Sequence, residues 1–216
     1  QAKSWQSEGK TPVTIAVNVS VVQFQQNDLV EQVREILEHE GLPPEQLGIE
    51  ITESLFAEDM EQTIDVLNAF KSLGVEIALD DFGTGYSSLS YLTKLPIDKL
   101  KIDQAFIRSA DRENWSIVRA IIQLSRSLGL KIVAEGVETL EHAQRLRDLG
   151  CQIGQGYHYS RALASDKFTK YWESMTSGSL TNTRFGTPTL RLGLPYFYAI
   201  ESLQASALQF WKGQPE

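Results

Sequence analysis

Short apolar runs alternate with longer segments of helical periodicity along most of this chain. The apolar runs lie at 13–19, 47–52, 75–80, 99–102, 131–134 and 152–154, and their length and branched residues are typical of buried strands. The helical segments repeat apolar residues at intervals of three and four, and they lie at 29–40, 60–73, 89–95, 117–128, 140–149 and 166–175. Regular alternation of strands with helices predicts a parallel sheet.

Glycines mark the ends of these helical segments. Gly41, Gly74, Gly129 and Gly150 each follow one of them. A glycine just past the last helical residue often takes the left-handed conformation that ends a helix. The repeated glycine therefore supports the predicted helix boundaries.

The tail of the chain has a different composition. Residues 177–189 are rich in Ser, Thr, Gly and Asn and are typical of a linker. Beyond Pro195, apolar residues from Phe197 to Trp211 recur at helical spacing, which predicts an amphipathic helix that needs a partner surface. We therefore expect a strand–helix domain over 1–176 and a linker with an amphipathic tail over 177–216.

Charged or amide residues lie at or just past the carboxyl end of every predicted strand. They are Asn18, Glu50, Glu53, Asp80, Asp81, Lys101, Asp103, Glu135, Glu138 and Gln155. In a closed parallel barrel these ends converge on one face, whereas in an open sheet they spread along an edge. Convergence of so many ligand-type residues favours a TIM-type (β/α) barrel, and an open doubly wound sheet is the alternative.

Asp80 and Asp81 form the most distinctive pair. They follow an apolar run and precede Phe82 and the glycine-containing segment 83–85. Desolvating two like charges at the exit of a core strand costs free energy, and divalent cations would offset that cost. The alternative for the pair alone is an N-cap or Asx-turn aspartate beside a solvated neighbour.

Mg²⁺ and Mn²⁺ prefer carboxylate and amide oxygens as ligands. One ion could be held by Asn18, Glu50 and Asp80. A second could be held by Asp81 and Glu135, with Asp80 shared between the two ions. Two such ions can clamp a phosphodiester and activate a water molecule.

Lys101 would lie among these carboxylates. It could hold or deprotonate the attacking water, or neutralise charge that develops on phosphate oxygens. Taken singly, the same residues have plainer interpretations: Lys101 as a surface lysine, and Glu50 and Glu53 as acids favoured at a helix N-terminus. Together on one barrel face, they favour phosphodiester hydrolysis.

Composition and charge limit the classes of partner and site that we expect. The chain has 28 acidic and 20 basic residues and a formal net charge of -8, so we do not expect binding to a nucleic-acid polymer. Its one cysteine excludes an internal disulfide and a cysteine-based zinc site. No apolar run reaches the roughly 18 residues of a membrane span, and the first residues do not form a signal peptide. We expect a cytoplasmic domain, which leaves open membrane anchoring of a longer protein.

The strand-end motifs, taken in order, resemble the successive signatures of one family. They are Asn18-Val19-Ser20, Glu50-Ile51-Thr52-Glu53, Asp80-Asp81-Phe82-Gly83-Thr84-Gly85, Lys101-Ile102-Asp103, Glu135-Gly136-Val137-Glu138 and Gln155-Gly156-Tyr157. This set is similar to that of the EAL-domain family, the bacterial phosphodiesterases of cyclic dimeric GMP. The resemblance covers 14–175 and implies a TIM-type barrel that hydrolyses cyclic dimeric GMP to linear pGpG with two Mg²⁺ or Mn²⁺ ions.

The resemblance also implies a role for each motif residue. It implies metal ligation by Asn18, Glu50, Asp80, Asp81 and Glu135, catalytic roles for Lys101, Glu135 and Glu53, and support of metal, phosphate or base by Asp103, Glu138 and Gln155. Lys101 would hold the attacking water, and Glu53 would anchor the loop 82–88. The resemblance further implies a homodimer formed through that loop and nearby helices, and a sensory or GGDEF-type domain upstream.

One family feature is missing from these residues. The Glu-Ala-Leu strand that names the family, whose glutamate is a metal ligand and is followed by a phosphate-binding arginine, has no counterpart here. We therefore expect a barrel without its first two strands and first helix, in which 1–10 is the end of the second helix. The chain would be a fragment of a longer signalling protein, a truncated inactive product, or a domain whose gap is filled by other elements such as the tail helix 196–211.

Two functions remain open on this basis. The first is a metal-dependent phosphodiesterase of cyclic dimeric GMP, for which we expect the isolated 216-residue chain to hydrolyse little or nothing. The alternative is a catalytically inactive receptor for cyclic dimeric GMP or a protein-interaction module.

Overall fold

A parallel, curved sheet forms the centre of the molecule. The computed structural model describes residues 2–9, 13–26, 28–57, 59–83, 89–109, 111–176 and 197–198. The strands are β1 (Ile15–Asn18), β2 (Leu47–Thr52), β3 (Glu76–Phe82), β4 (Lys99–Ile102), β5 (Lys131–Ala134), β6 (Ile153–Gly154) and β7 (Phe197–Tyr198), and the sheet order is β6-β5-β4-β3-β2-β1-β7. From β1 to β6 the spatial order follows the chain order, as in a (β/α) barrel, whereas a doubly wound sheet reverses its order part-way. The prediction of an incomplete (β/α) barrel is confirmed.

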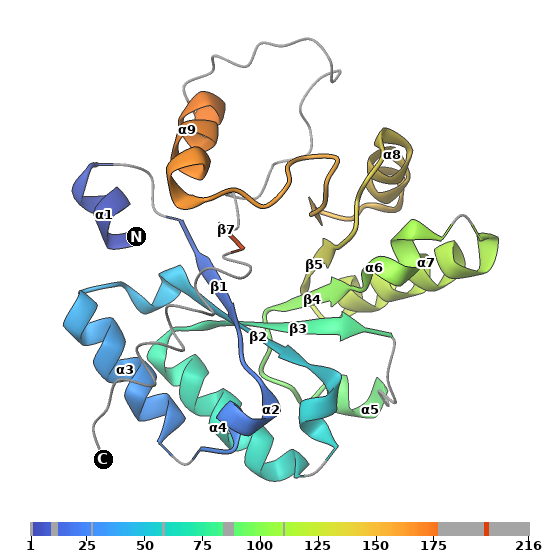
Figure 1. Cartoon of the computed structure of the whole chain (residues 1–216). Helices are drawn as coiled ribbons and strands as arrows, with labels where there is room; N and C mark the ends of the chain where they lie inside the picture. The colour runs from blue at the N-terminus through green and yellow to red at the C-terminus, as the bar shows by residue number, and fades with distance from the viewer. Residues whose placement is uncertain are drawn as a thin grey trace.

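Helices cover the outer side of this curved sheet, as Figure 1 shows for α3, α4, α7 and α8. The helices are α1 (Ala2–Ser7), α2 (Val21–Phe24), α3 (Leu29–Glu40), α4 (Met60–Leu73), α5 (Leu89–Leu92), α6 (Gln104–Arg108), α7 (Arg112–Ser127), α8 (Leu140–Leu149) and α9 (Ser165–Thr176), with 3₁₀ turns at Pro44–Gln46 and Glu53–Phe56. Within the described residues, none of these helices is long and apolar enough to cross a membrane.

The hydrophobic core lies between the sheet and the outer helices. Alternate strand residues point toward the helices, and they are Ile49, Ile51, Ile77, Leu79, Leu100 and Ile102. They pack in one cluster with helix residues such as Phe70 of α4 and Val118 of α7. Burial of each such side chain is worth about 1.5–3 kcal/mol, so this layer fixes the position of the strands.

The other face of the sheet, which we call the inner face, carries polar side chains. Successive strand residues point to opposite sides, so Glu50, Asp80, Lys99 and Lys101 alternate with the core residues. All four are buried. The inner face is therefore where buried charge must be compensated.

Left-handed glycines end the helices that the sequence predicts best. Gly41 (φ 61), Gly74 (φ 95) and Gly150 (φ 79) follow α3, α4 and α8, whose bounds match the prediction. The start of α7 was predicted too late, at 117, because the first turn from Arg112 is largely polar and carries no apolar repeat.

The tail differs from its prediction where it is described. Phe197–Tyr198 form β7, which pairs in parallel with β1, so the predicted helix is wrong at these two residues. The remainder of the predicted tail helix and the predicted linker 177–189 lie outside the described residues.

Candidate active site

A bulge at the carboxyl end of β3 brings two aspartates together. Leu79 pairs with Leu100, and Phe82 pairs with Ile102. Between these two pairs β3 contains one more residue than β4, which defines the bulge. Within it, Asp81 has φ 54, a left-handed conformation that few non-glycine residues adopt. A bulge re-aims a side chain that would otherwise alternate to the other face. With the bulge included, β3 extends to Phe82, beyond the predicted end at Asp80. Carboxylate oxygens of Asp80, Asp81 and Glu135 lie within 4.8 Å of one another.

Lys101 lies at the centre of the site. Its Nζ is 2.8 Å from Glu50 Oε2, 2.9 Å from Asp80 Oδ2 and 2.7 Å from Glu135 Oε1, and its side chain is only 2% exposed. Glu50, Asp80 and Lys101 come from β2, β3 and β4, and Glu135 directly follows β5. Three carboxylates against one ammonium leave two negative charges in excess when all are ionised.

This excess is reflected in the pKa of two acids. Burial raises the pKa of Glu135 to about 7, against the opposing attraction of Lys101 and with the help of the charge on Asp80. Burial also raises the pKa of Asp81 to about 6, and a hydrogen bond with Asp103 and the charge on Asp80 add to the effect. The cluster therefore has too little positive charge of its own to keep every carboxylate ionised below neutral pH.

The residues present fit a divalent cation. Asp80, Asp81 and Glu135 can each offer a carboxylate oxygen, which is the donor type that hard cations prefer. Asn18, the last residue of β1, is exposed and pairs in register with Glu50, so its amide lies at the same end of the sheet. The added positive charge would offset the excess negative charge around Lys101.

Glu53 ties the segment after β3 to the turn after β2. The Gly83 backbone N–H donates a 2.9 Å hydrogen bond to Glu53 Oε1. The second oxygen, Oε2, is buried and has no hydrogen-bond partner among the described residues. The family resemblance implies dimer contacts for the loop 82–88, of which residues 84–88 lie outside the described part of the chain.

Asp103 and Gln155 adjoin the cluster. Asp103 interacts with Asp81, and its Oδ1 accepts a 2.6 Å hydrogen bond from the Ala105 N–H at the start of α6. The backbone N–H of Gln155 donates to the Ala134 carbonyl at the end of β5, at 2.8 Å. Its side-chain oxygen is buried without a partner in the described residues, so it is available to a hydrogen-bond donor.

Glu138 has a different partner. It is exposed, and its Oε1 lies 2.7 Å from the Arg108 guanidinium at the end of α6. Sequence reasoning did not single out Arg108, because nothing in the local pattern brings α6 to the segment after β5. The described contacts do not join Glu138 to the carboxylate cluster.

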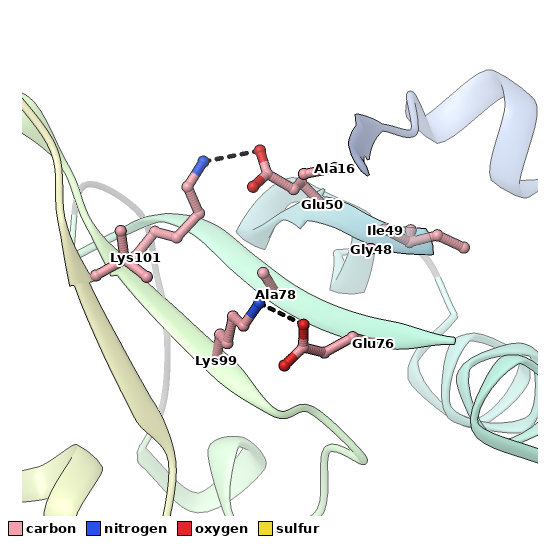
Figure 2. Close-up of a pocket in the computed structure, with 9 residues that line it drawn as sticks. Ala16, Gly48, Ile49, Glu50, Glu76, Ala78, Lys99 and Lys101 are labelled. Carbon is pink, nitrogen blue, oxygen red and sulfur yellow. Dashed lines mark hydrogen bonds and ion pairs between the residues drawn. The ribbon is translucent and has the colours of Figure 1, made fainter. Parts of the chain in front are cut away.

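A second ionic group, also not singled out from the sequence, lies further along the inner face. Glu76 pairs with Lys99 and, at 3.0 Å, with Lys131, and burial lowers the pKa of Lys99. Figure 2 shows the pair of Lys99 with Glu76 beside that of Lys101 with Glu50, around a cavity of about 10 Å³. The sequence feature that could have revealed this group is the two-residue spacing of Lys99 and Lys101, which places both lysines on one face of β4.

The fold and the site define a (β/α)-barrel protein with a carboxylate–lysine cluster at the carboxyl ends of its strands. The chain belongs to the EAL domain family, whose sequence profile matches residues 1–162. The family prediction made from the strand-end motifs is confirmed.

Two curated relatives come from Pseudomonas aeruginosa. The bifunctional diguanylate cyclase/cyclic di-GMP phosphodiesterase MucR is 43% identical over 169 residues, which is 77% of this chain and 25% of MucR. The cyclic di-GMP phosphodiesterase NbdA is 43% identical over 157 residues, which is 72% of this chain and 20% of NbdA. The chain thus spans a quarter or less of the length of these relatives.

Solved structures agree with this assignment. A complex of the MucR phosphodiesterase with c-di-GMP superposes with a TM-score of 0.74 at 42% identity, and the match covers 77% of this chain and 68% of that one. Klebsiella pneumoniae BlrP1, in a complex with manganese and cyclic di-GMP, matches with a TM-score of 0.66 at 34% identity over 74% of this chain and 41% of that one. The chain therefore shares the fold of proteins solved with this dinucleotide.

Proposed function

We propose that this chain carries the active site of a metal-dependent phosphodiesterase that hydrolyses cyclic dimeric GMP to linear pGpG. The observation that carries the proposal is the buried Lys101, in contact with carboxylates of Glu50, Asp80 and Glu135 beside the bulged Asp81. Four neighbouring strand ends place three carboxylates and one ammonium group together, with an excess of negative charge. A role in stability alone does not explain this arrangement. The names of MucR and NbdA support the same activity.

The metal ligands in this proposal are the five strand-end residues named from the sequence. Asn18, Glu50 and Asp80 would hold one Mg²⁺ or Mn²⁺ ion, and Asp81 and Glu135 would hold a second, with Asp80 shared. Such ions polarise a phosphoryl oxygen and lower the pKa of a bound water. The close approach of Asp80, Asp81 and Glu135 supports this assignment, as does manganese in the BlrP1 complex.

Side chains of this chain would position the attacking water and the phosphate. Lys101 Nζ would donate to the attacking water and stabilise negative charge on the phosphate. Glu135, as a ligand of the second ion, would be held ionised by that ion and would help to position the attacking water beside Lys101. Glu53, which accepts from the Gly83 N–H, would hold the loop after β3 in place.

Three further residues would bind or support the substrate. Gln155 Oε1, which is buried and has no hydrogen-bond partner among the described residues, would accept a hydrogen bond from a guanine base. Asp103, which adjoins Asp81 and caps α6, would support the metal site from beside it. Glu138 would act at the periphery, together with Arg108.

The alternative function is that of a catalytically inactive receptor for cyclic dimeric GMP or of a protein-interaction module. A domain that uses Gln155 and Lys101 for binding, but does not activate a water molecule, would bind the dinucleotide without hydrolysing it. The two functions predict different products from the same protein.

The proposal extends to the oligomeric state of the domain and to its neighbouring domains. We infer a homodimer formed through the loop after Asp81 and nearby helices, and an upstream sensory or GGDEF-type domain in a cytoplasmic setting. The bifunctional name of MucR supports a neighbouring cyclase domain.

The test is to incubate the protein with cyclic dimeric GMP, with Mg²⁺ or Mn²⁺ and, in parallel, with EDTA. We expect linear pGpG only when metal is present. Saturable binding in calorimetry without product would reject the enzyme in favour of the receptor. If the protein neither binds the dinucleotide nor forms product, the interaction module is favoured.

A further inference from the structure

A basic cleft lies between α7 and α8, away from the strand-end site. Its volume is about 250 Å³, and it is lined by Arg112, Trp115, Ser116, Arg119, Arg145 and Leu149. None of these residues belongs to the carboxylate cluster. The helices that carry these residues, α7 and α8, lie on the outer side of the sheet (Figure 1).

The cleft concentrates positive charge on an acidic protein. The net charge of the chain is -8, yet three arginines line this one cleft. Two arginines elsewhere in the described residues do have acidic partners, Arg34 with Glu31 and Arg108 with Glu138. Among the described residues, Arg112, Arg119 and Arg145 form no ion pair. The cleft therefore presents guanidinium groups with which no carboxylate of the described residues pairs.

Arg145 is held in position by an aromatic ring. Its guanidinium carbon lies 4.3 Å from the centroid of the Trp115 ring. The ring is buried, at 4% exposure, and its Nε1 donates a 3.1 Å hydrogen bond to the Ser109 carbonyl. A guanidinium that is already stacked loses less side-chain entropy when it binds an anion.

The arrangement of the polar groups suits a compact anion with more than one charge. Arg112, Ser116 and Arg119 follow one another at intervals of four and three along α7 and so share one face of the helix, and Arg145 joins them from α8. Guanidinium groups present planar forks that match phosphate oxygens. A single carboxylate would neutralise one of the three charges, whereas a phosphate dianion neutralises two.

We propose that this cleft is a second ligand site, which binds a phosphate group of inorganic phosphate or of a small phosphorylated metabolite. Because Arg145 stacks on Trp115, recognition depends on the phosphate rather than on a stacked base. The site does not depend on the proposed phosphodiesterase activity, so either can fail without the other.

The test is calorimetric titration of the full chain with sodium phosphate, at fixed ionic strength set with chloride and at a pH where phosphate is a dianion. Adenosine monophosphate and sodium acetate are titrated in parallel. We expect saturable binding of phosphate, no saturable binding of acetate, and at least tenfold weaker phosphate binding in Arg119→Ala and in Arg145→Ala. Equal affinity for phosphate and the nucleotide would identify free phosphate as sufficient, and tighter nucleotide binding would identify a phosphorylated metabolite.

The matched control is Arg147→Ala, since Arg147 is exposed on α8 and does not line the cleft. It should bind phosphate as the unchanged chain does. Absence of saturable phosphate binding by the folded chain, equal binding of acetate, or an equal loss in Arg147→Ala would overturn the proposal. Circular dichroism of each variant separates loss of the ligand site from loss of fold.

Discussion

At the scale of single residues, Lys101 is the group on which the proposed site depends most. Its position near the carboxyl end of a strand could be predicted from the sequence, as could the carboxylates at the ends of neighbouring strands. Its three contacts, at 2.7–2.9 Å, could not be predicted, because they depend on the register between strands far apart in the chain.

Replacing Lys101 by methionine should destabilise the metal-free protein. The change leaves Glu50, Asp80 and Glu135 buried together without their shared cation, and breaking such a buried pair costs about 3–5 kcal/mol. Urea unfolding of the full chain at neutral pH in EDTA measures the loss. The control is Lys131→Met, whose partly exposed pair with Glu76 should be worth less than about 1 kcal/mol. Equal losses would show that Lys101 is not the central counter-charge.

Glu135 should make the stability of the metal-free protein fall as the pH rises. Its pKa is about 7 in the folded state against an ordinary value of 4.5, so between these limits the folded state binds more protons than the unfolded state. The free energy of unfolding therefore decreases from about pH 4.5 to about pH 7, by at most roughly 3 kcal/mol from this group. Urea unfolding in EDTA should show this fall in the unchanged chain relative to Glu135→Gln. A difference between the two proteins that does not vary with pH would contradict the assignment.

Asp81→Asn should separate folding from metal binding. Asparagine tolerates the left-handed conformation at φ 54, so the bulge of β3 should be retained. The carboxylate is lost, and calorimetric titration with Mn²⁺ should give at least about tenfold weaker binding than the unchanged chain. Unaltered Mn²⁺ affinity would mean that Asp81 is not a ligand.

At the scale of elements, local signals predicted most boundaries. The predicted bounds of β2, β4, β5, α3, α4 and α8 agree with those observed. These segments combine clear periodicity with a glycine or a charged residue at their ends. The extension of β3 to Phe82 was missed because the bulge arises from its pairing with β4. The short α6 was missed because Asp103, interpreted as a site residue, is also the N-cap of that helix.

The loop after β6 should be sensitive to a single methyl group. A Cβ at Gly156 would lie 2.3 Å from the Val137 carbonyl oxygen, so the backbone would have to move. Gly156→Ala should cost about 3 kcal/mol or more in urea unfolding. Gly129→Ala is the control, since no atom lies within 4 Å of its Cβ position and only the left-handed φ of 72 costs about 1–2 kcal/mol. Similar losses in the two variants would show that the loop after β6 is free to shift.

At the scale of the whole molecule, the order of polar strand ends predicted the family and the barrel. The six strands β1 to β6 follow one another in space, and their carboxyl ends carry the predicted ligand-type residues. The local sequence could not predict which of these residues meet. Glu138 instead contacts Arg108, and the ionic group of Glu76, Lys99 and Lys131 lies on the inner face away from the strand ends. Such pairings are set by packing between elements, which no local pattern records.

The most direct test is the rate of pGpG formation by the full-length protein, unchanged and with Asp80→Asn, in saturating Mn²⁺. Asp80 contacts Lys101 and joins Asp81 and Glu135 in the carboxylate group, so losing one of its oxygens should affect both proposed ions. We predict metal-dependent hydrolysis of cyclic dimeric GMP by the unchanged protein and a rate at least about 100-fold lower in the folded variant. A variant that keeps the full rate, or an unchanged protein that forms no linear product, would contradict the assignment of this site.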